Sequence, residues 1–171
     1  MPNHLLILGI IHTAISVFAL LAAFAALSQE GKINPQSVTG KLYTWLTIIT
    51  CLTGFPIMKT GHLTGGHYLG VIILILLPLA IYAKRLFGKA GAYLQVILMS
   101  TTLFLSMIPA IIETLTRLPI SHPLATGPND PVIQKGLSAL LMLYLVGVCY
   151  QLIKLRSQVK AAKIAGGVSN T

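Results

Sequence analysis

The sequence predicts an all-α, multi-pass membrane protein built as a bundle of five transmembrane helices. Of its 171 residues, 55% are hydrophobic and 9% are charged, whereas about a quarter of the residues in a soluble domain are charged. The mean hydropathy is +0.84. Because one crossing takes roughly 20 apolar residues, the chain has room for about five spans, and a separate soluble domain does not fit.

Five apolar runs separated by polar or proline-rich segments are the expected helices. The first run follows an N-terminus without Lys or Arg and lacks a small-residue cleavage site after it, so we expect it to remain as a span. Pro78 in the third run and Pro109 in the fourth are expected to kink their helices. The runs cover approximately residues 5–27, 42–58, 67–83, 92–112 and 133–153.

The polar and small residues within the runs indicate which helix faces pack inward. In the first run such residues recur at steps of three and four, which predicts close contact with a neighbouring helix. In the fourth run, a stripe containing Gln95 and Thr102 is expected to face the bundle. A segment with four prolines, 118–132, is expected to form an irregular loop. The face of the first run consists of Gly9, His12, Ser16, Ala19, Ala23 and Ala26.

The positions of Lys and Arg predict the orientation in the membrane. One side receives nine of these residues and the other receives three, which places the N-terminus outside and the C-terminus in the cytoplasm of a bacterial-type inner (plasma) membrane. The chain then divides into a five-helix transmembrane domain, 1–156, and a basic cytoplasmic tail, 157–171, with a disordered end. The nine are Lys32, Lys41, Lys84, Arg85, Lys89, Lys154, Arg156, Lys160 and Lys163, and the three are Lys59, Arg117 and Lys135.

All five histidines fall on the outer half of this arrangement. His12 is the most informative, because a histidine within the hydrocarbon region usually faces a partner, a cavity or a cofactor. A hydrogen bond to a neighbouring helix is the alternative interpretation. The five are His4, His12, His62, His67 and His122.

Three chemistries could use these side chains, and the sequence leaves all three open. A b-type haem could be ligated axially by His12 and His67, which both lie on helices. A copper or zinc ion could be bound by His62 and His67 together with His122 or His12.

The third chemistry is a proton or quinone site, with titrating or hydrogen-bonding groups from His12, His67, Tyr68 and Glu113. Arg117 follows Glu113 at the spacing of a helical ion pair, so a structural pair is the alternative interpretation for these two residues.

The pattern His67-Tyr68-Leu69-Gly70, which opens a long aliphatic run, resembles the small transmembrane b-type cytochromes and related bacterial helical-bundle proteins. The resemblance covers the second and third runs. It implies that His12 and His67 are haem ligands and that Gly70 lets the porphyrin or a helix come close. Members of that group with two haems place histidine pairs toward both membrane faces, whereas here one haem at the outer side is implied.

We therefore expect a small integral membrane subunit associated with electron transfer, binding one haem b or a metal through its outer histidines. The alternative is a non-catalytic structural or accessory subunit of a larger membrane complex, with no cofactor of its own. The sequence lacks the paired carboxylates within the bundle and the phosphate-cradling loop that would indicate an enzyme. The expected partners are the lipid bilayer, other membrane subunits and, for the third chemistry, a quinone. The scattered basic residues do not indicate nucleic acid.

Overall fold

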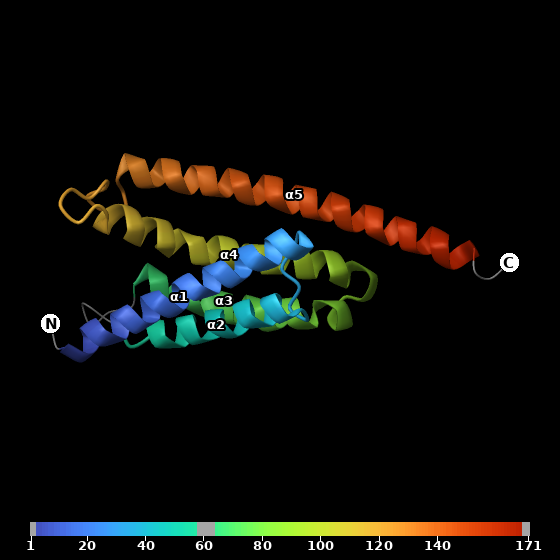
Figure 1. The fold of residues 1–171 in the computed structure, drawn as a ribbon, viewed down its shortest axis with the longest axis horizontal. Helices are drawn as coiled ribbons and strands as arrows, with labels where there is room; N and C mark the ends of the chain where they lie inside the picture. Colours follow the sequence, from blue (N-terminus) through green and yellow to red (C-terminus); the bar gives the residue numbers. More distant parts are fainter. Residues whose placement is uncertain (1–2, 58–63, 169–171) are drawn as a thin grey trace.

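The computed structural model describes residues 3–57 and 64–168, and these residues form five helices joined by short connections and one longer loop (Figure 1). The described residues contain no strand, which confirms the all-α prediction. The helices are α1 (Asn3–Glu30), α2 (Val38–Gly54), α3 (Gly65–Leu86), α4 (Gly88–Arg117) and α5 (Pro131–Val168).

Consecutive helices run in opposite directions, so the bundle has two distinct ends (Figure 1). The α1–α2 and α3–α4 connections and the C-terminal part of α5 lie at one end. The start of α1, the end of α2, the start of α3 and the α4–α5 loop lie at the other. We call the first the basic end, defined by Lys32, Lys84, Arg85, Lys89 and Lys154, and the second the histidine end, defined by His12, His67 and His122.

Four of the helices are long and apolar enough to cross a membrane, which defines a multi-pass membrane protein. They correspond to the predicted first, third, fourth and fifth spans. The α2 helix has 17 residues and is not one of the four. At 1.5 Å per residue it is about 26 Å long, which is slightly less than the roughly 30 Å of a bilayer's hydrocarbon core. The four segments are Ile7–Glu30, Gly65–Leu86, Gly88–Arg117 and Pro131–Ala161.

The α2 helix begins and ends earlier than the predicted run of 42–58. Ser37 caps its start, because the Ser37 hydroxyl accepts a hydrogen bond from the Gly40 amide at 3.2 Å. Pro56 has no N–H with which to extend the helix beyond Gly54. The chain instead closes a turn, in which the Ile57 amide donates to the Gly54 carbonyl at 3.1 Å.

The core lies between α1, α2, α3 and α4. Tyr43, Leu77 and Met99 are completely buried there. Ala23 and Ala26 of α1 are also completely buried, which confirms the predicted packing for the C-terminal part of its small-residue face. Gly9, at the other end of that face, has nothing within 4 Å of an added Cβ. The Tyr43 hydroxyl lies 3.0 Å from the Thr102 hydroxyl and links α2 to α4.

The α3–α4 hairpin is very tight, since Phe87 alone separates the two helices. Gly88 has a φ of +50°, which favours glycine at this turn. Gly91 then packs directly on α3, where an added Cβ would lie 2.4 Å from the Ala83 carbonyl oxygen. The two helices therefore approach closely at the basic end.

The α5 helix packs on α4 and on no other helix in the described part of the chain. Thr101 and Tyr144 bring their hydroxyls within 2.8 Å of each other, and Ser100 donates to Gln151 at 2.9 Å. The helix continues to Val168 without a break and extends beyond the other helices (Figure 1). The basic segment predicted as a tail is therefore helical through residue 168, and residues 169–171 lie outside the described part.

Candidate functional site

The two histidines predicted as cofactor ligands both bind the C-terminal end of α2. His12 approaches this end from α1 and His67 approaches it from α3. The residues that they contact, Thr53 and Phe55, are two positions apart in the chain. The structure therefore brings His12 and His67 to one place, although neither was predicted to bind α2.

His67 is buried, with 7% of its surface exposed, and both of its ring nitrogens have partners. The Thr64 backbone N–H donates to His67 Nδ1 at 3.0 Å. Because a backbone N–H can only donate, Nδ1 must be unprotonated in the neutral ring, and the proton must lie on Nε2. His67 Nε2 is 3.3 Å from the Phe55 carbonyl oxygen, to which it therefore donates.

These bonds make His67 part of the N-terminal cap of α3. Thr64 is the N-cap residue and His67 stands three positions later, where a capping box usually has Glu or Gln. The Thr64 hydroxyl also lies 2.9 Å from His67 Nδ1. One imidazole ring thus fixes the start of α3 and, through Phe55, the end of α2.

His12 is half-buried and has one ring nitrogen in a hydrogen bond. Its Nδ1 lies 3.2 Å from the Thr53 hydroxyl oxygen. The Thr53 hydroxyl donates to the Ile49 carbonyl at 2.9 Å, so His12 must donate from Nδ1, and Nε2 keeps its lone pair. Gly54 lies beside this ring, where an added Cβ would be 3.1 Å from His12 Cε1.

The remaining predicted site residues do not join this pair. Tyr68 is 60% exposed on α3, and His122 is exposed in the α4–α5 loop. Glu113 and Arg117 form an ion pair on α4, with 2.5 Å between Oε2 and Nε, and both side chains are more than half exposed. His62 lies outside the described residues. Within residues 3–57 and 64–168, no three potential metal ligands are grouped together.

Neither Thr53, Thr64 nor Phe55 was predicted from the sequence as a partner of a histidine. Thr64 could have been found from the spacing Thr64-x-x-His67, which is the spacing of a capping box with histidine in the place of Glu or Gln. The Phe55 carbonyl has no such signal, because it becomes available only when the helix stops at Pro56.

The fold and this site together define a multi-pass helical membrane protein whose polar groups tie helix ends to one another. No model of a protein family matches the chain, and no curated protein or solved structure matches it either.

Proposed function

We propose that the chain crosses a bacterial-type inner membrane five times, with the N-terminus outside and the C-terminus in the cytoplasm. The support is the separation of charge between the two ends of the bundle and the near-spanning length of α2. An antiparallel α2 is also needed to return the chain from the basic end to the histidine end before α3 begins.

We infer that the protein is a non-catalytic accessory subunit of a larger membrane complex. The observation that carries this proposal is the engagement of both nitrogens of His67. Iron or another metal needs the lone pair of an unprotonated imidazole nitrogen. In His67 the lone pair of Nδ1 accepts a hydrogen bond from the Thr64 N–H, and the proton on Nε2 is donated to the Phe55 carbonyl. In this arrangement the ring is unsuited to be an axial ligand.

The shape of the molecule also favours a role in assembly. The α5 helix has 38 residues, about 57 Å at 1.5 Å per residue, and only one side of it contacts α4. Its outward side carries large apolar residues, among them Met142, Leu143 and Val146, each more than 60% exposed. This side suits either lipid or the helix of another membrane subunit.

Electron transfer through a b-type haem or a metal is the second candidate function. It is favoured by one observation, which is that His12 and His67 reach the same end of α2 from different helices. His12 Nε2 has the free lone pair that a ligand requires. For His67 to take part as a neutral ligand, its ring would have to release the Thr64 N–H, and binding through Nε2 would also require it to release Phe55.

An absorption spectrum of membranes containing the overexpressed protein, reduced with dithionite and supplied with a haem precursor during growth, separates the two candidates. An accessory subunit gives no added haem band and no stoichiometric iron, copper or zinc after purification. A reduced band that disappears in both His12→Leu and His67→Gln would instead establish the electron-transfer function.

Crosslinking in native membranes tests the assembly itself. A photoreactive residue at Leu143, on the outward side of α5, is expected to give a discrete adduct with another membrane protein. The matched control is a photoreactive residue at Ile75, which is 62% exposed on α3. Lipid adducts alone at both positions would contradict the proposed role of α5.

A further inference from the structure

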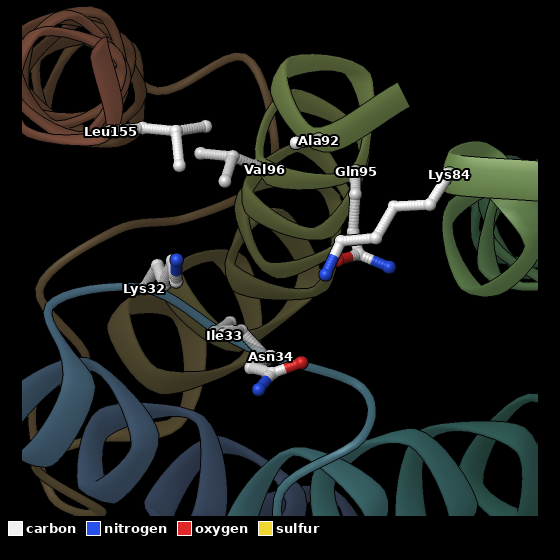
Figure 2. Close-up of a pocket in the computed structure, with 8 residues that line it drawn as sticks. All are labelled: Lys32, Ile33, Asn34, Lys84, Ala92, Gln95, Val96 and Leu155. Atoms are coloured by element: carbon white, nitrogen blue, oxygen red, sulfur yellow. The ribbon is translucent and has the colours of Figure 1, made fainter. Parts of the chain in front are cut away.

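A small cavity at the basic end joins four parts of the chain (Figure 2). Its volume is about 60 Å³, enough for several water molecules or one small oxyanion. The polar residues that line it are Lys32 and Asn34 from the α1–α2 connection, Lys84 from α3 and Gln95 from α4.

The polar groups around this cavity are mainly hydrogen-bond donors. Figure 2 shows Lys32 on one side and the Lys84 side chain crossing from α3 toward Gln95 on the other. The Asn34 side-chain oxygen accepts from the Gln36 amide at 3.1 Å, so the Asn34 NH₂ group is left to donate elsewhere. Lysine ammonium groups are pure donors, and this donor set suits an anion.

Gln95 gives the cavity a rigid wall. Its side chain is 95% buried, and its NH₂ group donates to the Ala80 carbonyl at 3.1 Å. The side-chain oxygen of Gln95 remains as an acceptor for a lysine ammonium or a ligand hydroxyl. Apolar side chains complete the lining, and Ile33, Val96 and Leu155 are each at least 92% buried.

Within the described residues, no salt bridge joins a lysine of this cavity to a carboxylate, and Glu30, at the end of α1 two positions before Lys32, does not line the cavity. No carboxylate lines the cavity, and the ion pair within residues 3–57 and 64–168 joins Glu113 to Arg117 on the last turns of α4. A third ammonium group stands close by, since Lys154 Nζ is 2.9 Å from the position of a Cβ added to Gly31. Lys32 is half-buried and Lys84 is exposed, so an anion from solution or lipid can reach them.

The position of the cavity in the bundle indicates where its anion comes from. It lies where two membrane-spanning helices, α3 and α4, meet at their hairpin. The ends of spanning helices lie at the depth of the lipid headgroups, whichever way the protein is oriented. Basic pockets between transmembrane helices are suited to anionic headgroups, and each Lys near the surface contributes to that attraction.

We propose that this cavity binds a phosphate group, and that the phosphate belongs to an anionic phospholipid. The ammonium groups of Lys32 and Lys84 hold the phosphate from two sides, and Asn34 donates to it. Val96 and Leu155 form the apolar part of the wall around the phosphate, and the rest of the lipid lies outside the cavity. Such a lipid would join the α1–α2 connection to α3, α4 and α5.

Native mass spectrometry of the full chain, released from nanodiscs, tests this proposal. The nanodiscs contain phosphatidylcholine with or without phosphatidylglycerol. The wild-type protein should retain one phosphatidylglycerol in preference to phosphatidylcholine. The double variant Lys32→Gln with Lys84→Gln should weaken that retention about 30-fold. This fold-change corresponds to the loss of about 1 kcal/mol of attraction for each lysine removed.

A matched control removes two charges from the same end without touching the cavity. Arg85→Gln with Lys89→Gln should weaken retention much less than the cavity double, because neither side chain lines the cavity. Lys32→Arg with Lys84→Arg should retain the lipid, because both positive charges remain. Circular dichroism and gel filtration show whether each variant is folded. Equal weakening in the two glutamine doubles would overturn the proposal, because it would indicate a diffuse charge effect.

A second arm separates lipid from free phosphate. In detergent, phosphatidylglycerol should raise the unfolding temperature of the wild type and leave that of the Lys32→Gln, Lys84→Gln double unchanged. Stabilisation by inorganic phosphate alone, without any preference between the two lipids, would overturn the assignment to a phospholipid.

Discussion

One imidazole ring, that of His67, fastens two helix ends at the histidine end of the bundle. Its two hydrogen bonds satisfy a backbone N–H at Thr64 and a backbone carbonyl at Phe55. Both groups lie at the end of a helix, where the backbone hydrogen bonds within the helix stop and cannot supply partners. Replacing the ring therefore leaves two backbone groups without their bonds.

We predict that His67→Ala lowers the free energy of unfolding by about 1–3 kcal/mol, the cost of leaving buried polar groups unpaired. His67→Gln should lose less, because glutamine at this position can still accept from the Thr64 N–H. Denaturation of the purified protein with increasing SDS in mild detergent measures both values. A His67→Ala protein as stable as the wild type would contradict the capping role.

Gly91 makes the closest helix approach at the other end. Gly91→Ala would place a methyl group 2.4 Å from the Ala83 carbonyl oxygen and force α3 and α4 apart. We expect a loss of about 1–3 kcal/mol, which is typical of overpacking. Gly147→Ala is the control, because nothing lies within 4 Å of its added Cβ. The same SDS titration should show little change for that variant, and equal losses in both would contradict this account.

At the scale of the helices, α5 is held by a few specific contacts. The rings of Phe104 and Tyr144 lie 4.8 Å apart, which is a favourable distance for an aromatic pair. The start of the helix is fixed separately by Asp130, whose carboxylate accepts from the Val132 amide at 2.9 Å and from the Thr126 amide at 3.1 Å. Because α4 is the helix on which α5 packs in the described part of the chain, these contacts help to hold α5 in place.

The Asp130 cap gives a pH-dependent prediction. The bonds from Val132 and Thr126 lower the pKa of the Asp130 carboxyl below its ordinary value. An unfolded Asp has a pKa of about 3.9, so the stabilisation is fully present above that pH and is lost as the pH falls through the lower folded pKa. The unfolding temperature of the wild type should exceed that of Asp130→Ala at neutral pH.

The difference between those two proteins should shrink below about pH 4 and disappear once Asp130 is protonated in the folded protein. Asp130→Asn serves as the control, because its amide oxygen can still accept at the N-cap without titrating. A difference that stays constant down to pH 2 would show that the carboxylate does not stabilise the start of α5.

At the scale of the whole molecule, the distribution of charge sets the orientation that we propose. By their positions in the sequence, nine of the twelve Lys and Arg residues of the chain fall on the side of the basic end. We predict that, after Thr171, a reporter that works only in the cytoplasm is active and a reporter that works only after export is inactive. After Gly127, in the α4–α5 loop, we predict the reverse. Opposite results at both sites would invert the orientation, and two reporters on the same side would contradict five spans.

The sequence predicted the parts of this fold that follow from composition and periodicity. Long apolar runs must become helices in lipid, because no water satisfies their backbone groups, and the small-residue face of α1 required a close neighbour. The early end of α2 was harder to predict, since apolarity continues through Phe55 to Met58 while Pro56 stops the helix.

The candidate site could be predicted only in outline. The sequence indicated that His12 and His67 need partners, but their bonds run to a hydroxyl and a carbonyl of α2, and their formation depends on how α1, α2 and α3 are arranged. The cavity at the basic end was not predicted at all. Its residues come from four separate elements, and within the sequence its lysines are indistinguishable from those that set orientation.

The proposed accessory role depends on His67, because neither of its ring nitrogens is free. Nitrogen-15 NMR of the histidine-labelled protein in bilayers, with assignment by the His67→Gln variant, tests this property. We predict a neutral His67 with its proton on Nε2 and an unprotonated Nδ1, and a neutral His12 with its proton on Nδ1. A His67 ring without a proton on Nε2, or with the shift of a metal-bound nitrogen, would contradict the claim and restore the electron-transfer function.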